Sequence, residues 1–172
     1  MAMIFFFTAG QSLLEAKIRS LPPSAYPELP SGVVDELERR ACQIPQIQRH
    51  KRSNVIQGEF IRPGQADWAV LCMTKQDTSL LVFENGSERQ PMEIARNRNT
   101  FRSWEIRAVA ESFMLNWVGT RKPLQHISHQ GISSSTDSGD PNSGRFYDYA
   151  AETTVHYFDG EKWIKLGTLV VN

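Results

Sequence analysis

The strongest constraint on the fold is a series of three strand-like segments between residues 55 and 83. The first leads into the turn pair Pro63-Gly64, the second is the apolar run 68–72, and the third is 79–83, which ends at Asn85-Gly86. Proline and glycine favour turns, whereas β-branched, aromatic and other apolar residues in short runs favour strands. This order predicts an antiparallel β-meander in the middle of the chain.

A second hairpin is predicted near the C-terminus. Residues 153–158 and 161–166 are strand-like, and the pair Asp159-Gly160 separates them. Asp-Gly between two strand-like runs is a strong hairpin signal, because both residues tolerate the positive φ angles that a tight turn requires.

The segments between the two hairpins are less regular. Residues 104–109 alternate between apolar and polar types and predict a half-buried strand, and residues 112–118 predict another. We expect a short helical turn over residues 90–95, a polar loop over 96–99, and a flexible loop over 133–144, which contain no apolar residue.

The N-terminal part predicts an arm and a helix. Four prolines in residues 21–30 exclude a helix or a central strand there, and Tyr26 and Leu29 are the expected anchors of this arm. Helical apolar spacing begins after Ser31, and we expect Pro45 to end the helix. The predicted fold is therefore α+β: an antiparallel sheet of about five to seven strands, one N-terminal helix and a proline-rich arm.

Length and charge limit the classes of function. At 172 residues, the chain predicts a single α+β domain over residues 21–172, preceded at 1–20 by a signal-peptide remnant or an N-terminal extension. Lys and Arg together number 19, as do Asp and Glu, so the net charge is zero and we expect no nucleic-acid partner. No apolar run approaches ~20 residues, so we expect no membrane span.

The chain has two cysteines, Cys42 and Cys72, which fit either one disulfide in an oxidising compartment or two reduced thiols. Cys42 falls at the end of the predicted helix and Cys72 in a predicted central strand, so a bridge would attach the helix to the sheet. We predict this disulfide, with two reduced core cysteines as the alternative. A closed loop of about 30 residues would stabilise the fold by roughly 3–4 kcal/mol in the chain-entropy model.

Residues 58–70 resemble the FG-GAP repeat unit of integrin-type propellers, in which loop carboxylates bind calcium. Glu59 and Asp67 stand at two of the acidic positions, whereas Ile61 and Pro63 occupy positions that should supply side-chain oxygens. Because calcium takes six to eight oxygen ligands, we expect the turn to be kept without the ion, and we expect no metal or other cofactor.

The order of motifs resembles a group of uncharacterised exported bacterial proteins. The motifs are Cys-Gln-Ile-Pro-Gln at 42–46, the segment 63–72, His-Gln-Gly-Ile at 129–132 and the hairpin at 157–163. This resemblance implies a periplasmic or secreted protein with paired cysteines, and it implies no known activity.

Two sets of residues are candidates for a site. His126 and His129, with Asp148 downstream, could supply metal ligands or a general base, whereas the alternative reading is a turn in which the imidazole bonds to backbone. A second candidate is an aromatic binding surface, set against the alternative that strand aromatics pack in the core; its residues are Trp104, Trp117, Tyr147 and Tyr149.

The function we expect is that of an exported, non-enzymatic binding or interaction module with an unknown protein or glycan partner. The alternative is a hydrolase or metal-dependent enzyme that uses His126 or His129. A histidine and a carboxylate in one cleft would favour the enzyme.

Overall fold

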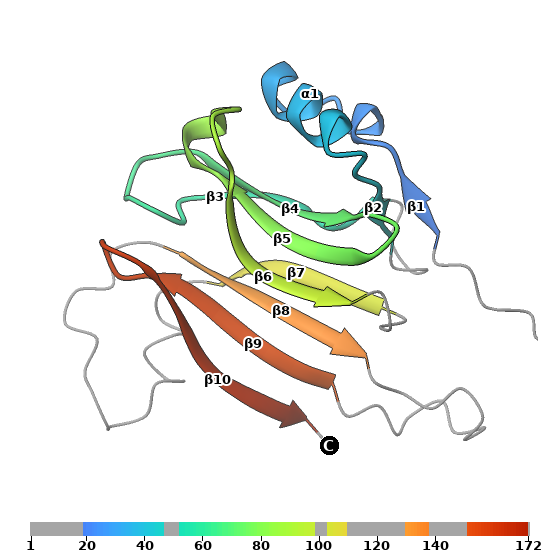
Figure 1. The fold of residues 1–172 in the computed structure, drawn as a ribbon. Coiled ribbons are helices and arrows are strands. Elements are labelled where there is room, and N and C mark those ends of the chain that lie inside the picture. The colour runs from blue at the N-terminus through green and yellow to red at the C-terminus, as the bar shows by residue number, and fades with distance from the viewer. Residues whose placement is uncertain (1–18, 47–51, 99–102, 110–129, 138–150, 172) are drawn as a thin grey trace, which may run out of the picture.

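The computed structural model describes residues 19–46, 52–98, 103–109, 130–137 and 151–171. In these parts of the chain, two antiparallel sheets and one helix form three stacked layers (Figure 1). The middle sheet has the strand order β3-β4-β5-β6, formed by Val55–Gly58 (β3), Asp67–Met73 (β4), Asp77–Phe83 (β5) and Met92–Arg98 (β6). The second sheet has the order β10-β9-β8-β7, formed by Ser103–Val109 (β7), Gly131–Asp137 (β8), Ala151–Phe158 (β9) and Trp163–Val171 (β10).

The third layer comes from the N-terminal segment, which covers the outer face of the middle sheet (Figure 1). Its elements are Ser20–Leu21 (β1), the 3₁₀ turn Pro23–Ala25 (η1), the helix Ser31–Arg39 (α1) and Ile44–Pro45 (β2). β1 and β2 pair with each other as a small antiparallel sheet. A second 3₁₀ turn, Glu84–Gly86 (η2), follows β5 at the position where Asn85-Gly86 predicts the end of the meander.

The helix begins as predicted and ends earlier than predicted. It starts at Ser31, but it ends at Arg39 because Ala41 adopts a left-handed φ of 56°. The N–H groups of Ala41 and Cys42 then bond back to carbonyls of the last helical turn, which is a common way to close a helix. Pro45, the predicted helix breaker, lies in β2 instead.

β4 and β5 are buried on both faces, which explains why their sequences are continuous apolar runs. Successive strand residues point to opposite faces, so each strand contributes to two cores. The core toward the helix contains Tyr26, Leu29, Val33, Leu37, Cys42, Ile44, Trp68, Val70, Cys72, Leu81 and Phe83. The core between the sheets contains Phe60, Ile61, Ala69, Leu71, Leu80, Val82, Trp104, Ile106 and Ile132.

The expected arm anchors, Tyr26 and Leu29, are both buried. The Tyr26 hydroxyl donates to the Ser53 carbonyl at 2.8 Å and accepts from the Gln46 side-chain amide at 2.7 Å. The proline-rich arm is therefore fixed to the chain just before β3 by hydrogen bonds as well as by apolar burial.

Asn54 connects the two sheets, and the bonds of its side chain cross the gap between them. It is 2 % exposed and has a left-handed φ of 66°. Its side-chain amide donates to the carbonyls of Pro45 at 2.8 Å and Trp104 at 2.7 Å, and its Oδ1 accepts from the N–H of Ile106 at 3.1 Å. A single side chain thus satisfies backbone groups of β2 and β7 where no strand pairing is available to them.

The two sheets meet again at the other end of β3. The backbone N–H of Gln130 donates to the Glu59 carbonyl at 2.8 Å, and the side-chain oxygen of Gln130 accepts from the Glu59 N–H at 3.1 Å. Hydrogen bonds at both ends of β3 therefore fix how the second sheet lies on the first.

Several predicted elements are confirmed. The meander is β3-β4-β5, the hairpin at Asp159-Gly160 is β9-β10, and the strand predicted over 104–109 is β7. The described residues confirm a fold that is broadly α+β and mostly antiparallel.

The predicted strand number is wrong, because the described residues form ten strands in three sheets instead of one sheet of five to seven. The helical turn predicted over 90–95 and the polar loop over 96–99 are instead largely β6, which pairs with β5 and has a bulge opposite Leu80 and Leu81. The flexible loop predicted over 133–144 is also wrong at its start, because residues 133–137 belong to β8. The predicted strand 112–118 lies outside the described residues.

Candidate functional site

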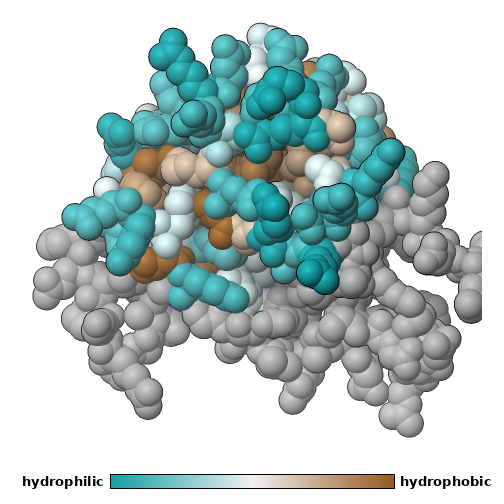
Figure 2. Space-filling view, in the orientation of Figure 1, coloured by the Kyte–Doolittle hydropathy of each residue, from teal (hydrophilic) through white to brown (hydrophobic). Residues whose placement is uncertain are grey.

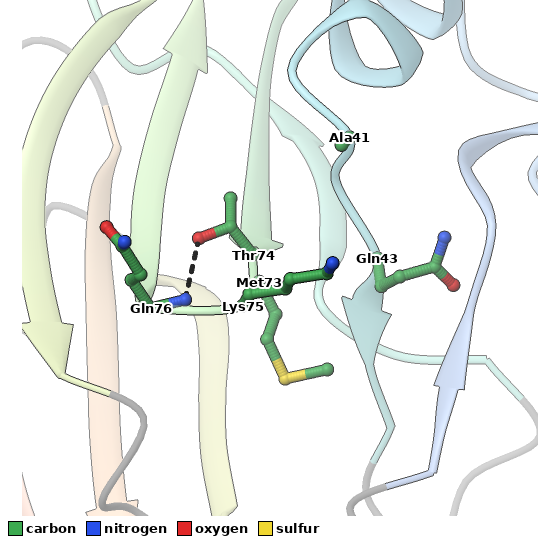
Figure 3. A pocket seen from close by; sticks show the side chains of 6 residues that line it. All are labelled: Ala41, Gln43, Met73, Thr74, Lys75 and Gln76. Carbon is green, nitrogen blue, oxygen red and sulfur yellow. Dashed lines mark hydrogen bonds between the residues drawn. The ribbon is translucent and has the colours of Figure 1, made fainter.

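A hollow of about 510 Å³ opens where the β4–β5 hairpin meets the link between α1 and β2 (Figure 3). Its lining residues are Ala41, Gln43, Met73, Thr74, Lys75 and Gln76. Two separate parts of the chain therefore form its walls, and what joins these parts determines how rigid the hollow is.

The two walls are joined by backbone pairing. The N–H of Gln43 donates to the Met73 carbonyl and the N–H of Met73 donates to the Gln43 carbonyl, both at 2.8 Å. Each of these residues directly follows a cysteine of the disulfide. The cysteines point into the core on the helix side, so their neighbours Gln43 and Met73 are free to line the hollow.

The predicted disulfide between Cys42 and Cys72 is confirmed. The two residues are 1 % and 3 % exposed, so the bridge is buried beneath the helix. It joins the link after α1 to β4, as the sequence predicts for a clamp between helix and sheet, although Cys42 lies just beyond the helix.

The hairpin wall has its own hydrogen bonds. The Thr74 N–H donates to the Asp77 carbonyl at 2.8 Å, and the Thr74 hydroxyl oxygen accepts from the N–H groups of Gln76 and Asp77 at 3.3 Å. These hydrogen bonds organise the turn around Thr74. The backbone positions of Lys75 and Gln76 are therefore well defined.

The hollow combines an apolar base with polar groups at its rim. Met73 is half-buried, whereas Gln43, Lys75 and Gln76 are exposed. In Figure 3 the Lys75 side chain extends toward the Gln43 side of the hollow. Among the described residues, no acidic side chain forms an ion pair with Lys75.

Sequence reasoning selected none of the six lining residues. The available signal was indirect, because Gln43 and Met73 follow the two cysteines whose pairing was predicted. A disulfide between Cys42 and Cys72 also brings their neighbours Gln43 and Met73 together. This places two of the six lining residues side by side.

A second polar feature lies inside the second sheet. His156 on β9 is buried, and its Nε2 is 3.3 Å from the hydroxyl oxygen of Ser134 on β8. Burial, and to a lesser extent the charge of Lys165, lowers the pKa of His156 to about 4. The imidazole is therefore neutral at pH 7.

The Ser134–His156 pair has the spacing of a nucleophile and a base, but its surroundings do not suit catalysis. Ser134 is 6 % exposed and His156 is 5 % exposed, so the hydroxyl cannot meet a substrate. A base with a pKa of about 4 also accepts a proton poorly at neutral pH. Among the hydrogen bonds between described residues, none joins a carboxylate to this imidazole.

The residues selected from the sequence fall in different places. Trp104 is 5 % exposed in the core between the sheets, where it cannot contribute its ring to an open aromatic surface. The other aromatic candidates and the enzyme candidates lie outside the described residues: Trp117, Tyr147, Tyr149, His126, His129 and Asp148.

Residues 58–70, for which the sequence predicts a turn without calcium, form a compact loop around Asp67, which is fully buried. One carboxylate oxygen of Asp67 accepts the N–H groups of Phe60 and Ile61, at 3.0 and 2.9 Å. The other accepts the Gln65 side-chain amide at 2.6 Å and the Asn85 N–H at 2.9 Å. Four donors therefore occupy the oxygen atoms that a calcium ion would need.

Glu59, the other acidic residue of this loop, also accepts a hydrogen bond from a backbone N–H group. A carboxylate oxygen of Glu59 accepts the Gly64 N–H at 2.9 Å. Gly64 has a φ of 73° at the predicted Pro63-Gly64 turn, a conformation that glycine adopts without strain. Within the described ranges, no three His, Cys, Asp or Glu side chains form a group that could hold a metal ion.

On the face seen in Figure 2, polar and charged side chains separate the apolar patches of the described residues. Large continuous exposed apolar patches mark interaction sites, and the interruption of the patches on this face gives no basis for a broad apolar interface there. The helices that the structure describes include none that is both long and apolar enough to cross a membrane. Comparisons with protein families, curated proteins and solved structures found no match for this chain.

Proposed function

We propose that the protein is an exported, non-enzymatic binding module that holds its ligand in the hollow at the β4–β5 hairpin. The observation that carries the proposal is the joining of the two walls through the Gln43–Met73 backbone pair and the adjacent disulfide. Walls that are fixed before the ligand arrives lose little conformational entropy on binding. A volume of about 510 Å³ is also within the usual range for small-molecule sites.

Export is supported by the disulfide. Structural disulfides persist in oxidising compartments and are rare where thiols are kept reduced. The resemblance of the motif order to exported bacterial proteins points the same way, and together these arguments favour a periplasmic or secreted location.

The non-enzymatic reading is supported by the state of the Ser134–His156 pair. This is the closest approach to a catalytic constellation in the described part of the chain, and its burial and the low pKa of His156 make it a packing feature. A hydrolase or metal-dependent enzyme built on His126 and His129 remains the alternative prediction.

A ligand panel followed by NMR tests the proposal. The panel contains sugars, amino acids, short peptides, fatty acids and nucleotides, and ¹H–¹⁵N spectra of the full chain are recorded before and after each addition. We expect at least one class to shift the signals of residues 41–43 and 73–76 while the ligand itself stays unchanged. Conversion of a ligand to product, or the failure of every class to shift these signals, would overturn the proposal.

Thiol counting tests the location. The chain is isolated from its native cells in the presence of a thiol-blocking reagent, denatured without reduction, and compared with a reduced sample. Before reduction, we expect neither cysteine to carry the blocking group or to react as a free thiol. After reduction, we expect two free thiols. Two thiols before reduction would remove the support that the disulfide gives to export.

A further inference from the structure

We infer that the hollow recognises an apolar group that carries one carboxylate. This inference rests on the proposed function and adds the chemical class of the ligand.

The base of the hollow suits an apolar group. Met73 extends from the end of β4 on the face opposite the disulfide, and it lies outside the core that fills the space between the two sheets. A methionine side chain is unbranched and polarisable, so it adapts its shape to apolar ligands of different outline. The methyl group of Ala41 adds apolar surface on the other wall.

The rim suits an anion. Lys75 is the only ionisable residue among the six that line the hollow, and it is exposed at the tip of the hairpin. Gln43, whose side-chain amide donates to the Cys42 carbonyl at 3.2 Å, lies on the side toward which Lys75 extends, whereas the Gln76 side chain points away from Lys75 (Figure 3). An ammonium group beside an apolar base matches a carboxylate placed at the end of an apolar tail.

The nearby acidic side chains do not cancel this preference. Asp77, which follows Gln76, lies 3.8 Å from a guanidinium nitrogen of Arg96. Glu36, on the last turns of α1, accepts hydrogen bonds from Arg39 and Arg40, which lower its pKa to about 2. Asp77 and Glu36 are thus already paired with arginines, whereas Lys75 forms no ion pair with any described acidic residue.

Two sources supply this chemistry: a free medium-chain fatty acid and the C-terminal residue of a peptide that ends in an apolar side chain. Octanoate represents the first source and N-acetyl-leucine represents the second. Octanamide and N-acetyl-leucinamide have nearly the same shapes without the charge, so each pair isolates the contribution of the carboxylate.

The experiment measures the dissociation constants of these four compounds by NMR titration of the oxidised, full-length chain. We expect octanoate or N-acetyl-leucine to shift residues 41–43 and 73–76 and to bind about fivefold more tightly than its amide. Lys75→Gln should remove that difference and Lys75→Arg should keep most of it. Lys162→Gln is the matched control, because Lys162 is an exposed lysine on the separate β9–β10 hairpin.

Each outcome has a defined meaning. Tighter binding of octanoate or of N-acetyl-leucine supports the inference and names the source. Equal binding of acid and amide, or an equal effect of Lys75→Gln and Lys162→Gln, overturns it. If a sugar or nucleotide shifts the hollow while both acids do not, this inference fails and the proposed binding function stands. If no compound shifts the hollow, both fail.

Discussion

Replacing Asn54 with alanine would remove the side chain that joins the two sheets. The change leaves the Ile106 N–H without its acceptor and removes one donor from each of the carbonyls of Trp104 and Pro45, all in a buried setting, although the Gln46 side-chain amide still donates to the Pro45 carbonyl at 3.2 Å. One orphaned buried N–H costs about 2 kcal/mol, and the two carbonyls, each with a second lone pair, together cost about 1 kcal/mol. Alanine at a φ of 66° adds about 1 kcal/mol. The expected loss in the free energy of unfolding is about 4 kcal/mol.

Two further variants separate these contributions. Asn54→Gly relieves the backbone strain but keeps the lost hydrogen bonds, so it should cost about 3 kcal/mol. Asn85→Ala is the matched control, because Asn85 is exposed, has a φ of 50° and tests the left-handed backbone cost alone, at about 1 kcal/mol.

Urea unfolding followed by tryptophan fluorescence measures all three free energies of unfolding, with the slope of the transition checked for constancy. A loss below about 1 kcal/mol for Asn54→Ala, or equal losses for Asn54→Ala and Asn85→Ala, would refute the argument that Asn54 fastens the sheets.

Three other predictions concern the disulfide, pH and calcium. The double variant Cys42→Ala with Cys72→Ala should lose about 3–4 kcal/mol in urea unfolding, because the bridge closes a separation of 30 residues; an unchanged midpoint would contradict the clamp. His156 binds its proton near pH 6.5 when unfolded and only near pH 4 when folded, so stability should be complete above pH 6.5 and fall by about 3 kcal/mol as the pH drops to 4. His156→Gln should flatten that part of the stability curve, and an unaltered slope would show that other groups cause it. Millimolar calcium should leave the melting temperature unchanged, since hydrogen bonds occupy the Asp67 carboxylate, and a rise reversed by a chelator would disprove this reading.

The parts of the fold that the sequence predicts are those with strong local signals. Turn residues fix the β9–β10 hairpin, where Asp159 accepts the N–H groups of Glu161 and Lys162 at 3.0 and 2.9 Å. The apolar runs of β4 and β5 are recognisable as strands because a strand that is buried on both faces carries apolar residues at successive positions.

The missed strands depend on pairing that local sequence does not encode. β6 contains Glu93, Arg96 and Arg98, and its bulge places Glu93 and Arg96 close enough for an ion pair of 2.7 Å. β8 contains a run of serines with weak strand preference, yet it lies between β7 and β9 and pairs with both. In both cases the neighbouring strands decide the conformation, so the sheet must be known before the strand can be assigned.

The candidate site is harder to predict than the fold for a related reason. Gln43 and Met73 are 30 positions apart, and they are brought together by their own backbone pairing and by the disulfide next to them. No sequence motif marks Asn54 either. Its role in joining the sheets depends on the close approach of β2 and β7 to the start of β3.

All described strands of the middle sheet come from residues 55–98, and all described strands of the second sheet come from residues 103–171. A cut between residues 98 and 103 would therefore give two fragments, each carrying one whole sheet, and the disulfide would stay within the N-terminal fragment. For the same reason, two intact copies of the protein could exchange the segment that forms the second sheet, and the strand order within each sheet would stay the same. The bonds from Asn54 to Trp104 and Ile106 would then form between copies, which makes these bonds the natural place to look for a swapped dimer.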